Sequence, residues 1–345
     1  MSSRRQFVKS TGAALLGAPL LPSLNTFATQ DVLKPKRIAP GDTVGVVSPA
    51  SITHQPVRFE ILEETLDALG LKTKFGQHAQ DRWGYFAGKD EARAADLNRM
   101  FADPDVDHIF AVTGGWGAAR TLPHLDYDVI RANPKILMGY SDVTALLVGL
   151  YAKTGLVTFH GPNGLSTWNQ FTVDHTRPLL FDAQTPLLQN PTDKGDNLAQ
   201  IDDRVRTITP GTVRGRLVGG NLTVLTAIIG SDYLPDWSGH ILFLEDINEA
   251  VYRVDRMMTQ LKLAGVLDQI AGFVFGKCTD CGADSGYSSF TLEEVLFDHI
   301  QPLGIPAYHG AMIGHIADKF TVPLGIEAEL NADAGTLQLL EPAVV

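Results

Sequence analysis

The sequence contains few cysteines, only Cys278 and Cys281 among 345 residues. A structural zinc site built from thiolates needs about four of them, so this pair cannot form one. The pair also does not follow a strand that leads into a helix, as a thioredoxin-like redox motif does. We therefore interpret it as a loop pair that can form a local disulfide in an oxidising compartment.

Long apolar segments and positive charge are scarce as well. Although 44% of the residues are hydrophobic, no run reaches the roughly 18 consecutive apolar residues that a membrane-spanning helix needs. We expect no membrane span in the mature protein. The 28 basic residues are outnumbered by 39 acidic ones, which gives a formal net charge of −11. Nucleic-acid binding relies on patches of Lys and Arg, so we expect no nucleic-acid partner.

The first 28 residues are the exception to this acidity. They contain Arg4, Arg5 and Lys9 and no acidic residue, and an apolar stretch at 13–21 and small residues at 26–28 follow. A basic region, a short apolar region and a cleavable end are typical of a signal peptide. The paired arginines indicate the twin-arginine type. We predict a signal peptide over residues 1–28 and a mature protein in the periplasm; the alternative is a disordered basic tail.

Strand and helix patterns alternate through residues 40–165. Apolar, partly β-branched runs typical of buried parallel strands occur at 43–48, 108–112, 136–139 and 157–159, with helical patterns between them. This alternation predicts an α/β domain over residues 36–170, built on a doubly wound parallel sheet.

The alternation of strand and helix patterns does not continue over residues 171–210, where turn-forming residues cluster at 190–196. We predict a linker or surface loop there. A second domain is predicted over residues 211–345, with strands and helices and with β segments around 325–340. The sequence has neither an internal repeat nor a low-complexity segment, and a homodimer is compatible with it.

The segment Gly139-Tyr140-Ser141-Asp142 follows a predicted strand and leads directly into an apolar helix. A sharp turn between a strand and a helix is the layout of a nucleophile elbow, although the usual second glycine is absent. Such a turn exposes the Ser141 hydroxyl, and the free N–H groups of the helix N-terminus can stabilise an oxyanion. The alternative is that Ser141 or Asp142 simply caps the helix.

A second candidate element is the loop Gly114-Gly115-Trp116-Gly117, at the carboxyl end of the preceding strand. Open α/β sheets place their sites at this edge. Glycine lets backbone N–H groups approach a ligand closely, as an oxyanion donor must. The alternative is a plain turn. The pattern is not the G-x-G-x-x-G of dinucleotide sites, so a nicotinamide or flavin enzyme is only weakly supported.

A catalytic serine needs a base and an acid that orients the base. His315 lies in a predicted loop after a strand, a position that suits a base, and His160 and His309 at strand ends are its rivals. Glu245 ends an apolar strand and is placed to hold an imidazole. The alternative for Glu245 is a strand cap or an ion pair with an arginine of the following helix. No His–carboxylate cluster has zinc-ligand spacing, so we expect neither metal nor cofactor.

These residues, from about residue 36 to the C-terminus, resemble the LD-carboxypeptidase family, the muramoyltetrapeptide carboxypeptidases. The shared motifs, in the family's order, are Gly41 to Pro49, Phe86-Ala87-Gly88, Gly139-Tyr140-Ser141-Asp142, Gly219-Gly220-Asn221-Leu222, Leu244-Glu245-Asp246, and Gly314-His315 followed by Pro323-Leu324-Gly325. The resemblance implies an N-terminal domain similar to glutamine amidotransferases and a β-rich C-terminal domain that supplies the Glu and His.

The resemblance also implies the residue roles. Ser141 is then the nucleophile, His315 the base and Glu245 the orienting acid. The backbone N–H groups of Gly115 and Asp142 form the oxyanion hole. Gly114 and Trp116 are candidates for substrate binding. The implied substrate is a peptidoglycan-derived tetrapeptide that loses its terminal D-Ala.

The sequence departs from the family pattern at two positions near the glycine loop. Many members carry Arg where this chain has Thr113, and Trp116 replaces the usual Tyr. Typical members also act in the cytoplasm. These departures leave two alternatives open: a related hydrolase that inactivates a peptide-nucleotide antibiotic, and a periplasmic peptide-binding protein without catalysis.

Overall fold

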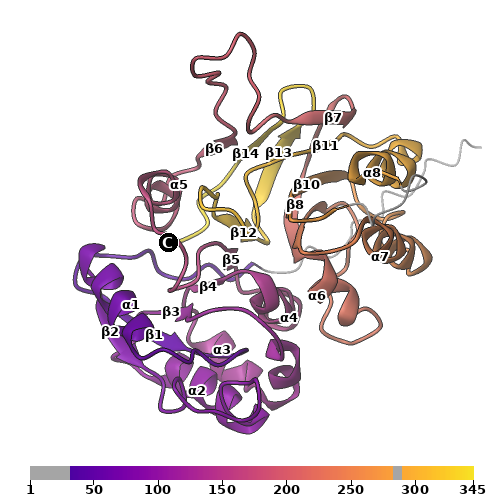
Figure 1. Cartoon of the computed structure of the whole chain (residues 1–345). Coiled ribbons are helices and arrows are strands. Elements are labelled where there is room, and N and C mark those ends of the chain that lie inside the picture. The colour runs from indigo at the N-terminus through magenta and orange to yellow at the C-terminus, as the bar shows by residue number, and fades with distance from the viewer. Residues whose placement is uncertain (1–31, 283–289) are drawn as a thin grey trace, which may run out of the picture. The chain divides into compact units, whose positions relative to one another are not determined.

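The computed structural model describes residues 32–282 and 290–345, so the predicted signal peptide at 1–28 lies outside the described residues. The described chain is organised around two sheets (Figure 1). No helix in these two ranges is long and apolar enough to cross a membrane.

The first sheet has the strand order β12-β5-β4-β3-β1-β2. Its strands are β1 (Thr43–Val47), β2 (Lys72–Phe75), β3 (His108–Ala111), β4 (Leu137–Gly139), β5 (Thr158–His160) and β12 (Val322–Leu324). The helices that alternate with them are α1 (Val57–Ala68), α2 (Asp90–Ala102), α3 (Tyr127–Ala132) and α4 (Thr144–Thr154), with 3-10 turns η1 (Ala118–His124) and η2 (Ser141–Val143). Strands β1 to β5 pair in parallel. The predicted doubly wound parallel sheet is confirmed.

This sheet also contains a strand from the far end of the chain. Strand β12 pairs antiparallel with β5, with Val322 opposite His160, and in Figure 1 the yellow β12 lies beside β5. Its central residue is Pro323, which has no N–H and is tolerated because β12 is the edge strand. The C-terminal part of the chain therefore reaches the carboxyl edge of the N-terminal sheet.

The second sheet has eight strands in the order β6-β14-β13-β8-β9-β10-β11-β7. They are β6 (Leu187–Gln189), β7 (Arg206–Thr209), β8 (Thr212–Asn221), β9 (Ile241–Ile247), β10 (Gly272–Thr279), β11 (Ala307–His309), β13 (Glu327–Asn331) and β14 (Thr336–Leu339). The accompanying helices are α5 (Gln170–Leu180), α6 (Leu222–Ala227), α7 (Val251–Leu263) and α8 (Leu292–Ile300), with the 3-10 turn η3 (Gln301–Leu303). Strands β8 to β11 are parallel and the outer pairs are antiparallel. This is the mixed, β-rich arrangement expected for the second half.

Residues 171–210 are more regular than the linker or surface loop predicted from the sequence. Helix α5 occupies their first part, and β6 and β7 add edge strands to the second sheet. Pro178 inside α5 disguises the helical pattern. Strand β6 has three residues and buries only Leu188, which is too short for a period-two pattern.

Candidate active site

Ser141 lies on the sharp turn between β4 and α4. Its φ is +64°, a left-handed value that costs a residue with a side chain roughly 1–2 kcal/mol. Such strain is found mainly where the surrounding structure holds a functional residue in place. Neither Ser141 nor Asp142 caps α4, whose N-cap is Val143. The capping alternative is therefore wrong, and the turn has the geometry of a nucleophile elbow.

The side chain of Asp142, the residue after Ser141, is bonded to the start of η1 and not to the helix that follows it. Its carboxylate is buried and accepts a 2.7 Å hydrogen bond from the N–H of Ala118, at the start of η1. Burial raises the pKa of Asp142 to about 6, against the opposing effects of this hydrogen bond and of Arg93. The side chain thus ties the Ser141 turn to the segment that follows the glycine loop.

The glycine loop packs directly on Ser141. A Cβ on Gly114 would lie 2.6 Å from the Cβ and 2.9 Å from the Oγ of Ser141, and 3.2 Å from the backbone N of Asp142. Gly115 has a φ of +113°, and a Cβ there would overlap Ser51. Only glycine allows this approach. The structure therefore brings the two backbone segments predicted to form an oxyanion hole side by side.

Glu245 and His315 are joined as predicted. Glu245 lies at the carboxyl end of β9 and is fully buried, and its Oε2 lies 2.7 Å from His315 Nδ1. The close approach needs Gly314, where a Cβ would lie 2.8 Å from the same oxygen. Burial by itself would raise the pKa of Glu245, but hydrogen bonds from His315 and Asn221 and attraction to His315 hold it below its ordinary value. With Nδ1 donating to the carboxylate, Nε2 is the atom left to accept a proton.

Two contacts connect this pair to the nucleophile turn. The ring of Tyr140, the residue before Ser141, packs on the ring of His315 with centroids 4.8 Å apart. Asn221, at the end of β8, donates from its backbone N–H to Thr144 Oγ1 in α4 and from its amide to Glu245. The carboxyl ends of β4, β8 and β9 therefore meet at one site.

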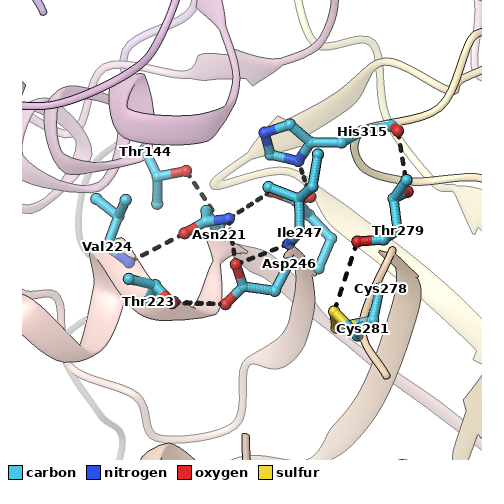
Figure 2. A network of polar contacts seen from close by, with 11 residues as sticks. Thr144, Asn221, Thr223, Val224, Asp246, Ile247, Cys278, Thr279, Cys281 and His315 are labelled. Carbon is cyan, nitrogen blue, oxygen red and sulfur yellow. Dashed lines mark hydrogen bonds and ion pairs between the residues drawn. A yellow bond between two sulfur atoms is a disulfide. The ribbon is translucent and has the colours of Figure 1, made fainter. Parts of the chain in front are cut away.

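Asn221 is the centre of a polar network to which the sequence analysis assigned no role (Figure 2). Its Oδ1 accepts from the N–H of Val224 and caps α6, while its Nδ2 donates to both Glu245 and Asp246. Asp246 also accepts from the N–H and the hydroxyl of Thr223. In the sequence, Asn221 stands out only as part of the shared motif Gly219-Gly220-Asn221-Leu222, which does not reveal what its side-chain amide contacts.

The rival histidines are not placed as bases. His160 is buried between Tyr140 and Phe243, and burial lowers its pKa to about 4. His309 lies at the end of β11, 4.0 Å from Glu293. Neither is hydrogen-bonded to Glu245.

A cleft of about 500 Å³ opens beside the glycine loop. It is lined by residues 51–55, Arg58, residues 113–116 and Leu165. The strand order reverses between β1 and β3, and the cleft lies beyond their carboxyl ends, where doubly wound sheets bind ligands. Trp116 lines it and is 67% exposed, with the exposed Tyr85 edge-on at 6.3 Å between centroids. The predicted substrate-binding candidates Gly114 and Trp116 thus border one cleft.

The two cysteines, interpreted from the sequence as a loop pair able to form a disulfide, are bonded as Cys278–Cys281 next to the site. Between them, Thr279 donates from its hydroxyl to the backbone carbonyl of His315 at 2.9 Å. The disulfide therefore constrains the end of β10 that supports the histidine loop (Figure 2). Within residues 32–282 and 290–345, no group of three or more His, Cys, Asp or Glu side chains is arranged to hold a metal ion.

Comparison with known proteins gives one consistent family. Residues 44–161 match the LD-carboxypeptidase N-terminal domain, and residues 214–330 match the LD-carboxypeptidase C-terminal domain. A probable murein peptide carboxypeptidase of Bacillus subtilis is 40% identical over 86% of this chain and 91% of its own length. The microcin C7 self-immunity protein of Escherichia coli is 33% identical over 88% of this chain and 94% of its own.

A solved structure is similar as well. The crystal structure of the muramoyltetrapeptide carboxypeptidase from Oxalobacter formigenes has a TM-score of 0.72 and 28% identity, covering 86% of this chain and 97% of that one. Together with the two domain matches and the sequence relatives, this establishes that the chain belongs to the LD-carboxypeptidase family.

Proposed function

We propose that this protein is a serine carboxypeptidase that removes the terminal D-Ala from murein tetrapeptides. The observation that carries the proposal is the bond between His315 and the buried Glu245, packed against the strained Ser141 turn. Relatives named murein peptide and murein tetrapeptide carboxypeptidase support the substrate class.

In the proposed reaction, His315 acts as a base and then as an acid, first when the acyl-enzyme forms and again when it is hydrolysed. His315 Nε2 takes the proton of the Ser141 hydroxyl as its oxygen attacks the carbonyl carbon before the D-residue. The N–H groups of Gly115 and Asp142 donate to the oxyanion. The C–N bond then breaks, and His315 gives its proton to the departing amine. Water, deprotonated by His315, hydrolyses the acyl-enzyme and restores Ser141.

We propose that the reaction takes place in the periplasm, after export by the twin-arginine pathway. The signal-like pattern of residues 1–28 motivates this. The Cys278–Cys281 disulfide is the kind of bond that persists in an oxidising compartment. The test is fractionation of cells that produce either the wild-type protein or the Arg4→Lys/Arg5→Lys double variant. The double variant should stay out of the periplasm, and a double variant that still reaches the periplasm would refute the twin-arginine route.

A second candidate function is hydrolysis of a peptide-nucleotide antibiotic. Trp116 presents an exposed aromatic ring at the cleft, with the exposed Tyr85 packed against it, which suits stacking with a nucleobase. One relative is a microcin C7 self-immunity protein.

Three substrates distinguish these functions: a murein tetrapeptide ending in D-Ala, the same peptide ending in L-Ala, and an aminoacyl sulfamoyl nucleotide. We expect the highest kcat/KM with the D-Ala peptide. Preference for the nucleotide substrate would support the second candidate, and equal cleavage of the D-Ala and L-Ala peptides would refute the proposed stereochemistry.

A further inference from the structure

Lys319 is a buried cation beside the active site that the proposed reaction does not use. It lies between the histidine loop and β12, and only 3% of its surface is exposed. Its Nζ is 4.7 Å from the centroid of the Tyr140 ring. The same ring packs on His315, 4.8 Å away between centroids. The ammonium group and the histidine therefore contact the same aromatic ring, which belongs to the residue before Ser141.

The charge of Lys319 is not neutralised by the protein. Among the described residues, no carboxylate oxygen lies within 4.0 Å of Lys319 Nζ, the distance limit of an ion pair. Glu245 and Asp318 attract it from farther away, but Glu245 is bonded to His315 and Asp318 to Asn169. Desolvation accordingly lowers the pKa of Lys319 to about 8. Burying an ammonium group without an ion-pair partner is costly, so the position of Lys319 calls for a reason.

A second polar group near the same ring also lacks a partner. His160 packs edge-on against Tyr140 at 6.1 Å, and both of its ring nitrogens are buried with no hydrogen-bond partner among the described residues. Buried polar atoms are normally satisfied, so the two nitrogens of His160 need an explanation. A cation and an imidazole that contact the same tyrosine are suited to receiving an anion.

We infer that Lys319 binds the free α-carboxylate of the substrate's C-terminal residue and thereby restricts the enzyme to chain ends. This inference rests on the proposed carboxypeptidase function. In such a substrate a single carbon atom separates the scissile nitrogen from the carboxylate carbon. An anion site against the ring of Tyr140, the residue before Ser141, is therefore suitably placed for that group. An endopeptidase has no need of such a cation.

The test compares a murein tetrapeptide ending in free D-Ala with the same peptide ending in D-Ala amide. Wild type is expected to prefer the free acid by about 10- to 100-fold in kcat/KM, since a charge-assisted hydrogen bond contributes this much. Lys319→Met should lose that preference, with the loss confined to the acid substrate and expressed mainly in KM. The amide substrate should be cleaved at nearly the wild-type rate.

Lys135→Met is the matched control. Lys135 is also partly buried with a pKa lowered by desolvation, but it precedes β4 and donates to the carbonyls of Met100 and Asp103. It should keep the wild-type preference for the acid.

Each result has a distinct meaning. Equal losses on both substrates in Lys319→Met would overturn the inference, because a purely structural lysine acts on both. If the wild-type enzyme cleaved the free-acid peptide and the amide peptide equally well, the inference would be overturned before any variant was tested. Release of D-Ala from neither substrate by wild type would instead refute the proposed function.

Discussion

Replacing Glu245 with Gln tests the histidine–acid pair with almost no change of shape. Glu245 presents two acceptor oxygens, one to His315 Nδ1 at 2.7 Å and the other to Asn221 Nδ2 at 3.2 Å. Glutamine has one oxygen and one NH2 group, so it can accept from only one of these donors. If its NH2 faces His315, the histidine must carry its proton on Nε2 and cannot take the proton of Ser141. If it faces Asn221, two donors oppose each other and the negative charge is still lost.

The size of the effect follows from these losses. The charge-assisted hydrogen bond contributes about 1.5–3 kcal/mol, and the wrong tautomer removes the base altogether. In serine proteases the equivalent change lowers kcat by about ten-thousandfold. We predict a loss of about a thousandfold to ten-thousandfold in kcat for Glu245→Gln, with KM little changed. This loss of kcat is measured as the rate of D-Ala release at saturating tetrapeptide, in samples stopped at successive times.

Asp246→Asn is the control for this prediction. Asp246 is the next residue on β9, is also buried and also accepts from Asn221, but does not contact His315. Its loss of activity should stay below about tenfold. A Glu245→Gln enzyme that folds as wild type by circular dichroism and retains more than a tenth of its kcat would refute the role of Glu245.

Further predictions concern the support of the site. Gly114→Ala should lower kcat at least about a hundredfold without unfolding the chain, because its Cβ would lie 2.9 Å from Ser141 Oγ; wild-type activity would contradict the packing. Asp142 has a folded-state pKa of about 6, raised by burial, so its stabilising effect is present at low pH and lost as the pH rises through 6. Asp142→Asn should therefore reduce the fall in unfolding free energy between pH 5 and 7.5 by about 1.5 kcal/mol in urea titrations, and an unchanged fall would contradict this. Reducing Cys278–Cys281 should lower the unfolding free energy by about 2 kcal/mol, as expected for so short a loop; no change between titrations with and without reductant would contradict it.

The Ser141 turn could be predicted because its signal is local. A buried strand, a glycine and an apolar helix follow one another within a few residues, and the structure has them as β4, the turn and α4. Glu245 is similar, since it directly follows the apolar run of β9. Neighbouring parallel strands of one sheet bring their carboxyl ends to one edge. Strands β4 and β9 belong to different sheets, so this rule places each residue at the end of its own sheet but does not predict that the two ends meet.

The positions of β12, Lys319 and the Asn221 amide could not be predicted, because they depend on contacts that no local sequence pattern encodes. Strand β12 has three residues with a central proline and pairs with β5 across a long stretch of chain. Lys319 resembles any surface lysine in the sequence, and only the placement of β12 and the histidine loop buries it. Asn221 has the pattern of a helix cap, but the direction of its amide is fixed by Glu245 and Asp246 from another strand.

The most direct test of the central claim is release of D-Ala from murein tetrapeptide by the mature protein and by its Ser141→Ala variant. Removing the nucleophile should lower kcat by several orders of magnitude while the peptide still binds. Equal release by both proteins would refute the serine mechanism. Tight peptide binding without release by either would show a binding protein instead, and would contradict the account of Ser141, Glu245 and His315 as a catalytic group.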